Sequence, residues 1–355
     1  MRPILVFVPA KPAFVILALA GAVLTALGLV PRFRKSQAFS YGWFLLLAAL
    51  VVGRVGTGEW AFWSGWGRPW DPVPIYSYGV MLGLSLIIGW YLAIRLATAE
   101  GLPRDKIASL YMWTAVMAVV ASRLLYVFTN WGDFEGNLVD IVKVNKGGLV
   151  AYGGFLGGFL ASLVYCLRNQ IPILKWADNA VPSISLGLAL TRIGCFLYGC
   201  DFGARSSLPW AVRFPGPSRF AKFGSPAFEL HVRNYDLPQT ATASFPVHPT
   251  QLYESLLGLC LLFACLLVRK YRKTDGFVFL TFIWGYGVPR FLLEFIRDDE
   301  QRGKIGRWST SQIIAFVTSL LGIALFFYLR DRARRGTEAA DAVVPAAPKK
   351  RKQRS

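Results

Sequence analysis

Long apolar runs restrict what this chain can fold into. A helix needs about 20 mostly apolar residues to cross the hydrocarbon core of a bilayer, and the sequence contains about nine runs of roughly that length. They lie at residues 12–30, 39–55, 76–97, 107–128, 148–167, 177–198, 250–268, 276–296 and 311–329. The runs are too long and too uniformly apolar for the short alternating strands of a membrane β-barrel. The sequence therefore predicts an all-α polytopic membrane protein with about nine transmembrane helices.

Composition and charge agree with this class and orient the chain. Hydrophobic residues make up 54% of the sequence and charged residues 17%, which excludes a water-soluble globule. The net charge of +19 does not indicate a nucleic-acid partner, because the basic residues gather in alternate short loops. Such loops stay in the cytoplasm, so we expect the N-terminus outside and the C-terminus inside. The basic loops contain Arg32, Arg34 and Lys35; Arg95, Arg104 and Lys106; Arg168 and Lys175; Arg269, Lys270, Arg272 and Lys273; and the residues from Arg330 onward.

The chain is expected to have three parts. Residues 1–73 are predicted to form a two-helix membrane extension with a tryptophan-rich periplasmic linker, residues 74–330 a membrane core, and residues 331–355 a basic, disordered cytoplasmic tail. Within the core, residues 199–247 are predicted to form a small periplasmic cap. The first run is also compatible with a signal peptide, but Pro31 and Arg32 follow it directly, which favours a membrane anchor.

The cysteines do not indicate a metal centre. All five lie in or beside apolar runs, and they are not spaced as metal ligands, either among themselves or with His231 and His248. Small buried side chains are the simplest interpretation. Cys195 and Cys200 lie near the expected outer face, where an oxidising compartment could join them.

A glycine-dense run covers residues 147–161. Its spacing of Gly153 to Gly157 and of Gly154 to Gly158 lets helix backbones approach closely. Helix packing explains most of this run, and a close approach of backbone to a ligand is the alternative.

Ionisable residues inside the apolar runs are the strongest pointers to a site. Burying one costs at least about 2.5 to 3.5 kcal/mol on insertion scales, so each needs a partner or a function. Asp178 begins a run and could cap a helix end. Arg290 and Glu294 are four residues apart, so an internal ion pair is one interpretation. The set comprises Arg123, Asp178, Arg192, Glu254, Arg290 and Glu294.

A tally of these charges predicts surplus positive charge and hence a missing anion. The arginines are Arg123, Arg192, Arg290 and Arg297, and the acids facing them are Glu254 and Glu294. A phosphate suits this surplus because guanidinium donors match its oxygens bidentately. Tyr78 and Gln251 lie at the outer ends of their runs and are expected to complete the pocket. The residues themselves therefore predict a site for an anionic lipid headgroup at the outer leaflet.

Ordered motifs within residues 74–330 resemble those of the prolipoprotein diacylglyceryl transferases, a bacterial family. The motifs are "YSYGVMLGL", "ASRLLYVF", "GGLVAYGGFLGG", "DNAVPSISLGLALTRIGCFLYGCDFG", "LPWAVRFP", "HPTQLYES", "GYGVPRFLLEFIRDD" and "STSQI". Each motif is weak alone, whereas their joint order and spacing are specific. The first two runs and the basic tail lie outside the resemblance.

The resemblance implies an activity, its partners and a location. Members of the family transfer the diacylglyceryl group of phosphatidylglycerol to the lipobox cysteine thiol of a prolipoprotein. The products are a thioether and glycerol 1-phosphate. The implied partners are phosphatidylglycerol, the prolipoprotein signal peptide and membrane lipids, with no cofactor, no metal and no nucleic acid. The implied location is the bacterial inner membrane, with multiple spans and the active site toward the periplasm.

The resemblance also implies residue roles. Arg192 matches the arginine that holds the lipid phosphate, and Arg290 matches a second essential arginine. We expect the catalytic residues to be Arg192, Arg290, Tyr152 and Glu294. The residues expected to bind phosphatidylglycerol are Arg192, Arg290, Tyr78, Arg123, Gly203, His248, Gln251, Glu254, Tyr286 and Arg297.

Three positions depart from the family pattern. Tyr152 stands where the family commonly has a histidine proposed as the base, and a tyrosine, with a pKa near 10, is a poorer base at neutral pH. Cys195 and Cys200 stand where the family signature usually has asparagine and often glutamate. The acceptor of the thiol proton therefore stays open: Tyr152, Glu254 and Glu294 are the candidates. Alternatively, the field of the arginines alone is enough to ionise the thiol.

Two alternatives remain on the sequence alone. One is a paralogous enzyme that moves a different lipid group or modifies a restricted set of proteins. The other is a lipid-binding or transport protein, because membrane arginines can line a path as well as a pocket. Transporters more often show paired repeats with broken helices, and the sequence shows none.

Overall fold

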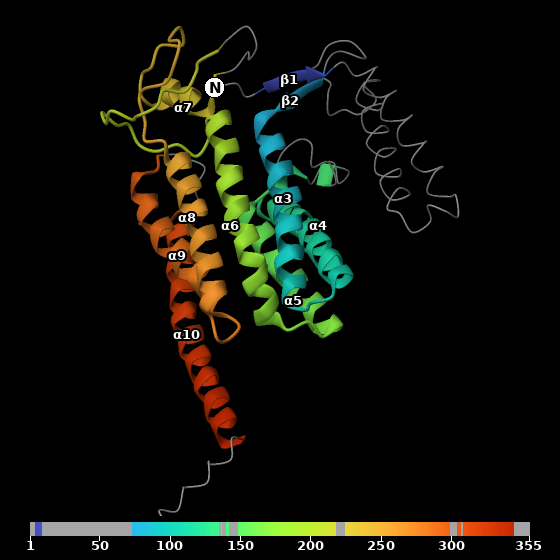
Figure 1. Cartoon of the computed structure of the whole chain (residues 1–355). Helices are drawn as coiled ribbons and strands as arrows, with labels where there is room; N and C mark the ends of the chain where they lie inside the picture. Colours follow the sequence, from blue (N-terminus) through green and yellow to red (C-terminus); the bar gives the residue numbers. More distant parts are fainter. Residues whose placement is uncertain are drawn as a thin grey trace, which may run out of the picture. The chain divides into compact units, whose positions relative to one another are not determined.

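The computed structural model describes residues 4–8, 73–134, 136, 140–141, 148–217, 224–298, 304–306 and 308–343. Within these residues, 7 helices are long and apolar enough to cross a membrane. They are α3 (Ser77–Ala99), α4 (Arg104–Thr129), α5 (Ala151–Asn169), α6 (Ile173–Tyr198), α8 (Thr250–Tyr271), α9 (Phe277–Leu293, continued by the 3-10 turn η6, Glu294–Ile296) and α10 (Thr310–Val343) (Figure 1). The chain is thus an all-helical polytopic membrane protein.

Each of these helices overlaps one of the apolar runs from residue 76 onward, so that part of the helix prediction is confirmed. The expected spans at 12–30 and 39–55 lie outside the described residues. At the other end, α10 continues to Val343, beyond residue 330, where the sequence predicted a disordered tail to begin. Residues 344–355 lie outside the described residues.

The chain divides into two compact units. The first comprises Met1–Val80 and Ala115–Phe159, and the second comprises Met81–Thr114 and Leu160–Ser355. In the first unit, strands β1 (Ile4–Val8) and β2 (Val73–Tyr76) pair antiparallel. There α5 packs closely on α4, since a side chain at Gly153 would lie 2.6 Å from the carbonyl oxygen of Ala121 and one at Gly157 would collide with the Ala121 side chain. These two glycines therefore allow α5 to pack closely on α4.

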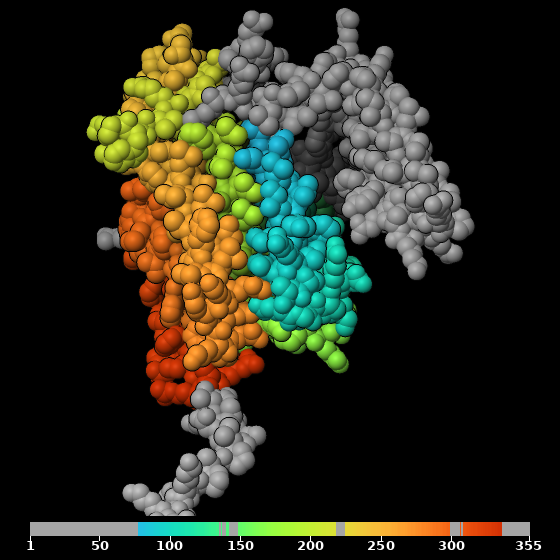
Figure 2. Space-filling view, viewed as in Figure 1, coloured from blue at the N-terminus to red at the C-terminus, as the bar shows by residue number. Residues whose placement is uncertain are grey.

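Helices α6, α8, α9 and α10 pack together in the second unit, most extensively α6 with α8 (Figure 1). A side chain at Gly258 of α8 would lie 2.7 Å from the main-chain nitrogen of Ala189 in α6, so the two backbones are in direct contact there. Away from these contacts, large apolar side chains such as Leu256, Phe263 and Leu267 of α8 are exposed. Figure 2 shows α8 on the visible face of the unit, and such a surface suits lipid rather than water.

Asp178 caps a helix end, as the sequence suggested. The capped helix is α9, however, and not α6, in which Asp178 lies. Its carboxylate, near the start of α6, accepts hydrogen bonds from the main-chain nitrogens of Gly276 and Phe279 at the start of α9, each at 2.7 Å. The carboxylate also pairs with Arg272, which in turn lies 2.6 Å from Glu100. These contacts satisfy the free amides of α9 and tie the α8–α9 turn to α6.

The segment between α6 and α8 folds into a compact subdomain at the ends of these helices. It contains α7 (Pro226–Asn234), with Ser225 accepting a hydrogen bond at its N-cap. Its buried side chains are Phe202, Phe214, Ala227, Leu230 and Val247. Isolated bridges such as Arg205 with Val247 and Pro215 with Ala243 tie its chain segments together, and a bridge between Gly203 and Arg297 joins it to the end of η6. Figure 1 shows it where α6 ends and α8 begins.

Candidate functional site

The site begins with the turn that ends α6. Arg192 lies near the end of this helix, and Gly199 follows it with a φ of 88°, a left-handed conformation that suits glycine. The main-chain nitrogens of Gly199 and Cys200 both donate to the carbonyl oxygen of Cys195, at 2.8 and 3.2 Å. The chain thereby reverses and brings Asp201 back beside Arg192, where Asp201 Oδ2 lies 2.9 Å from Arg192 Nη1.

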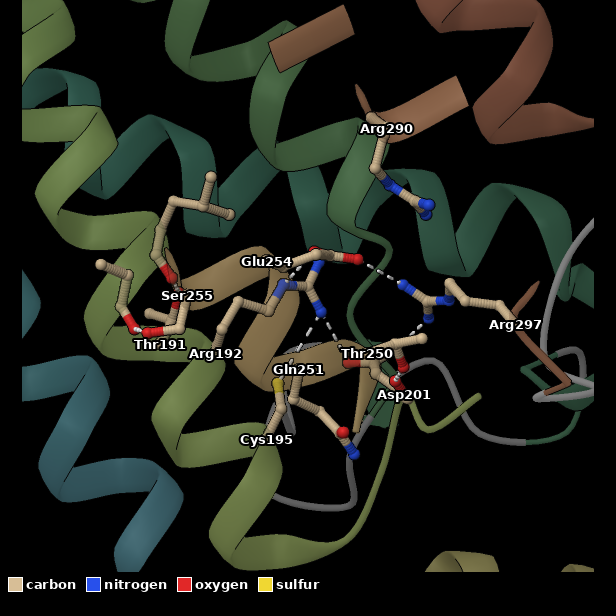
Figure 3. A network of polar contacts seen from close by, with 12 residues as sticks. Thr191, Arg192, Cys195, Asp201, Thr250, Gln251, Glu254, Ser255, Arg290 and Arg297 are labelled. Atoms are coloured by element: carbon tan, nitrogen blue, oxygen red, sulfur yellow. Dashed lines mark hydrogen bonds and ion pairs between the residues drawn. The ribbon is translucent and has the colours of Figure 1, made fainter. Parts of the chain in front are cut away.

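Arg192, Glu254, Arg297 and Asp201 form a closed ring of alternating charges, which we call the ion ring (Figure 3). Glu254 Oε2 lies 2.5 Å from Arg192 Nε, an ion pair that lacks the alignment of a hydrogen bond. Glu254 Oε1 lies 3.1 Å from Arg297 Nη1, and Asp201 Oδ1 lies 2.6 Å from Arg297 Nη2. Each carboxylate therefore bridges the two arginines through separate oxygens.

The ion ring is largely withdrawn from solvent, and its members differ in exposure. The exposed fraction is 1% for the Glu254 side chain, 4% for Arg297, 18% for Arg192 and 29% for Asp201. Burial by itself would raise the pKa of Asp201, but Arg192 and Arg297 outweigh it and lower that pKa to about 2. Asp201 is therefore an anion at neutral pH. Buried charges of this kind persist only when they are paired.

Arg290 and Glu294 form the internal ion pair that their spacing predicted, with 2.5 Å between Arg290 Nη1 and Glu294 Oε2. Arg290 Nη2 also donates to Ser311 Oγ of α10 at 3.1 Å. Both residues are buried, and Figure 3 shows Arg290 on the same side of the site as Glu254 and Arg297. Tyr286, one turn before Arg290, is close enough to Arg192, Arg290 and Arg297 for electrostatic interaction.

The predicted surplus of positive charge is wrong for this cluster. Its arginines are Arg192, Arg290 and Arg297, and its acids are Asp201, Glu254 and Glu294, so the charges balance. The tally omitted Asp201 because this residue follows the apolar run instead of lying in it. Only the turn after α6 brings its carboxylate back to Arg192.

The start of α8 supports the loop that carries Asp201. Thr250 Oγ1 donates to the carbonyl oxygen of Asp201 at 2.7 Å, and Gln251 Nε2 donates to that of Cys200 at 2.6 Å. The other amide atom, Gln251 Oε1, is buried and accepts no hydrogen bond from the described residues. A buried acceptor of this kind calls for an explanation, and a ligand hydroxyl is one.

Gly203 and His248 meet at the same loop. The main-chain nitrogen of Gly203 donates to the carbonyl oxygen of His248 at 3.0 Å, and a side chain at Gly203 would lie 2.7 Å from the His248 Cβ. Glycine is therefore required here by lack of space. The His248 ring lies 3.4 Å from the Tyr253 hydroxyl, which accepts a hydrogen bond from Trp210 Nε1 at 2.8 Å.

Tyr78, Arg123 and Tyr152 belong to the first unit, so their membership of a common pocket with the ion ring stays a prediction. Tyr78 is exposed, and Arg123 is buried. The Arg123 guanidinium donates to three main-chain carbonyl oxygens, of Asp140 at 2.6 Å, Ile141 at 2.9 Å and Gly148 at 3.0 Å. In this structure Arg123 therefore holds the chain that leads into α5.

Cys195 and Cys200 are free thiols next to the ion ring. Cys195 Sγ lies 3.9 Å from Arg192 Nη1, and Cys200 Sγ lies 3.7 Å from Asp201 Oδ2. Their sulfurs and an Asp201 oxygen lie within 4.8 Å of one another, a grouping that the sequence spacing did not suggest. A metal ion there would compete with Arg192 and Arg297 for Asp201. Interaction with Cys195 and burial raise the pKa of Cys200, so its thiol stays protonated.

Comparison with known proteins places these residues in a family context. A family model described as prolipoprotein diacylglyceryl transferase matches residues 69–328. A phosphatidylglycerol–prolipoprotein diacylglyceryl transferase of Clostridium tetani is 31% identical over 261 residues, which cover 74% of this chain and 95% of the relative. Transferase 2 of the same name from Clostridium perfringens is 30% identical over 263 residues, covering 74% and 94%. The similarly named protein of Geobacillus kaustophilus is 32% identical over 261 residues, covering 74% and 90%.

Proposed function

Because this chain belongs to the prolipoprotein diacylglyceryl transferase family, we propose that its ion ring is the site where phosphatidylglycerol is held and cleaved. The reaction is transfer of the diacylglyceryl group to the lipobox cysteine of a prolipoprotein. The cysteine sulfur forms a bond to the carbon of the diacylglyceryl group that carries the phosphate. The carbon–oxygen bond to that phosphate breaks, and glycerol 1-phosphate leaves.

One observation carries this proposal. Arg192 and Arg297 direct donors at the two oxygens of a single anionic group, which in this structure is the Asp201 carboxylate. A phosphodiester offers two non-bridging oxygens to the same pair of guanidinium groups. Negative charge grows on the phosphate as the carbon–oxygen bond breaks. Arginines that are already positioned in a largely dry site stabilise that charge where it develops.

The thiol proton needs an acceptor, and the contacts rank the candidates. Both oxygens of Glu254 already lie against arginines, which leaves neither free to approach the thiol. Glu294 is paired with Arg290. Tyr152 stands where the family commonly has a histidine, and we keep it as the proposed base. The substrate thiol has an unperturbed pKa near 8.5, so only a minor fraction is thiolate at neutral pH and an acceptor is needed.

We further propose an orientation in the membrane that puts the ion ring toward the periplasm. The basic loops face the cytoplasm of a bacterial inner membrane, so the ion ring and the subdomain of residues 199–247 face the periplasm. The subdomain then acts as a cap over the site. Residues 1–73 add two N-terminal spans to the 7 described ones, and residues 331–355 form the cytoplasmic tail.

The role of Arg192 is tested by substitution. Arg192→Ala removes one of the two phosphate contacts, so we expect transfer from phosphatidylglycerol to a model prolipoprotein to fall about 10²- to 10³-fold. Purified variants are assayed by the mobility shift of the lipidated product, with thermal unfolding as the check on folding. Arg168→Ala, at an exposed arginine in the last turn of α5, is the matched control. Wild-type rates in a folded Arg192→Ala protein would exclude this role.

A second candidate function is a related transfer with another lipid or a restricted protein substrate. Tyr152, Cys195 and Cys200, which depart from the family pattern, are the features that favour it. Complementation separates the two functions. A bacterial strain depleted of its own transferase should recover lipid attachment to a general prolipoprotein when this chain is expressed. Failure with normal membrane expression would favour the restricted activity.

A further inference from the structure

Asp201 differs from its partners in the ion ring. Arg192 and Glu254 lie in spanning helices and Arg297 directly follows η6, whereas Asp201 lies in the loop that leaves α6. With 29% of its side chain exposed, it is also the most accessible member. Its φ of 56° is a left-handed value that few residues other than glycine adopt, although aspartate tolerates it better than most. The backbone is thus held in an unusual conformation that directs this carboxylate at the arginines.

The loop that carries Asp201 is held by main-chain contacts that do not involve the Asp201 side chain. Thr250 and Gln251 hold the carbonyl groups of Asp201 and Cys200 to the first turn of α8. The Asp201 carboxylate contacts Arg192, Arg297 and the thiols of Cys195 and Cys200. Rotation of the side chain alone would therefore release the carboxylate from the ring and leave the loop in place.

Charge balance makes such a release necessary when a lipid binds. The ion ring has two positive and two negative members, so its net charge is zero. A phosphodiester entering the closed ring would bury a further negative charge while the arginine donors directed at Asp201 and Glu254 stay occupied, which is costly. If the phosphate takes the place of the Asp201 carboxylate, the charge balance of the ring is preserved. Glu254, with 1% of its side chain exposed, has no comparable access to solvent.

On the basis of the proposed function, we infer that Asp201 is an internal occupant of the phosphate site. Its carboxylate bridges Arg192 and Arg297 in the lipid-free protein, the lipid phosphate displaces it, and it returns to help expel the glycerol phosphate product. Asp201 thus sets the affinity for the phosphate group and keeps the arginines oriented between turnovers.

Steady-state kinetics of Asp201→Asn test this inference. The amide is nearly isosteric but uncharged, so it competes less well with phosphate. We expect the KM for phosphatidylglycerol to fall about tenfold, equivalent to ~1.4 kcal/mol. The inhibition constant of added glycerol 1-phosphate should fall similarly, and kcat should not rise because product leaves more slowly. Asp201→Glu keeps the charge and should return the KM toward the wild-type value.

The outcomes are distinguishable. If Asp201 only clamps the arginines, Asp201→Asn raises the KM or leaves it unchanged, and the inference is overturned. If the wild-type protein itself transfers nothing from phosphatidylglycerol, the proposed function fails instead.

Footprinting of the wild-type protein keeps the test independent of the variant's folding. Saturating glycerol 1-phosphate should increase modification of Asp201 by a carboxyl-directed reagent, read by mass spectrometry, and leave Glu254 protected. Unchanged or reduced labelling of Asp201 would overturn the inference.

Discussion

At the scale of single residues, the sequence indicates the arginines of the site but not all of their acidic partners. Arg192 and Arg290 stand out because they lie in apolar runs, where charge is expensive. Asp201 lies outside those runs and was missed, although it directly follows the Gly199 and Cys200 of the signature. The result is a neutral ion ring instead of surplus positive charge. An anion site in a protein can thus be occupied by the protein's own carboxylate.

Tyr152 carries the residue-scale prediction about proton transfer. If its phenol accepts the substrate thiol proton, Tyr152→Phe should lower kcat about 10²-fold. The measurement is a kcat profile between about pH 6 and 9, with the wild-type protein as reference. Equal turnover of the two proteins across this range would remove the tyrosine from the proton path.

At the scale of elements, the ends of helices decide how the second unit is assembled. The left-handed turn at Gly199 returns the chain to Arg192, and Asp178 of α6 supplies the cap for α9. The first contact joins two sides of a chain reversal, and the second joins segments about 100 residues apart in the sequence. The spanning helices therefore meet through specific polar ends as well as through apolar surfaces.

Asp178→Asn tests the element-scale role. The change weakens the cap of α9 and removes one of the acidic partners of Arg272, which keeps Glu100, so we expect a loss of about 1 to 3 kcal/mol in the free energy of unfolding. Unfolding in detergent solution measures it. Asp331→Asn is the control, because Asp331 pairs with Arg335 on an exposed surface of α10. Equal stability of the two variants would contradict a structural role for Asp178.

At the scale of the whole molecule, the 7 apolar helices that the structure describes and the compact subdomain both contain buried polar groups. One of them is His231 of α7, which is fully buried. Its Nδ1 accepts a hydrogen bond from the main-chain nitrogen of Phe245 at 3.1 Å, and its Nε2 has no partner among the described residues. Burial and the nearby Arg205 lower the pKa of His231, while Asp298 opposes this shift.

The subdomain is therefore expected to loosen in acid. With a folded pKa below the ordinary value of about 6.5, the unfolded state binds more protons, so stability is complete above that pH and falls below it. Protonation at Nδ1 would also break the bond from Phe245. Hydrogen exchange should show lower protection of the Phe245 amide at about pH 5.5 than at 7.5. His231→Gln should remove this difference and His248→Gln should keep it; the opposite pattern would contradict the role of His231.

The sequence by itself determined the class of protein, the 7 helices that the structure describes, the family and the arginines, because hydropathy and motif spacing are local properties of the chain. The Arg290–Glu294 pair was also predictable, since four residues separate neighbours on one helix face. Only the tertiary structure decided that Arg192 and Arg297 share Glu254 and Asp201, and that Asp178 caps α9. The physical reason is that a buried charge is neutralised by whichever group packing brings within a few ångströms, and helix packing together with the turns between helices determines which group that is.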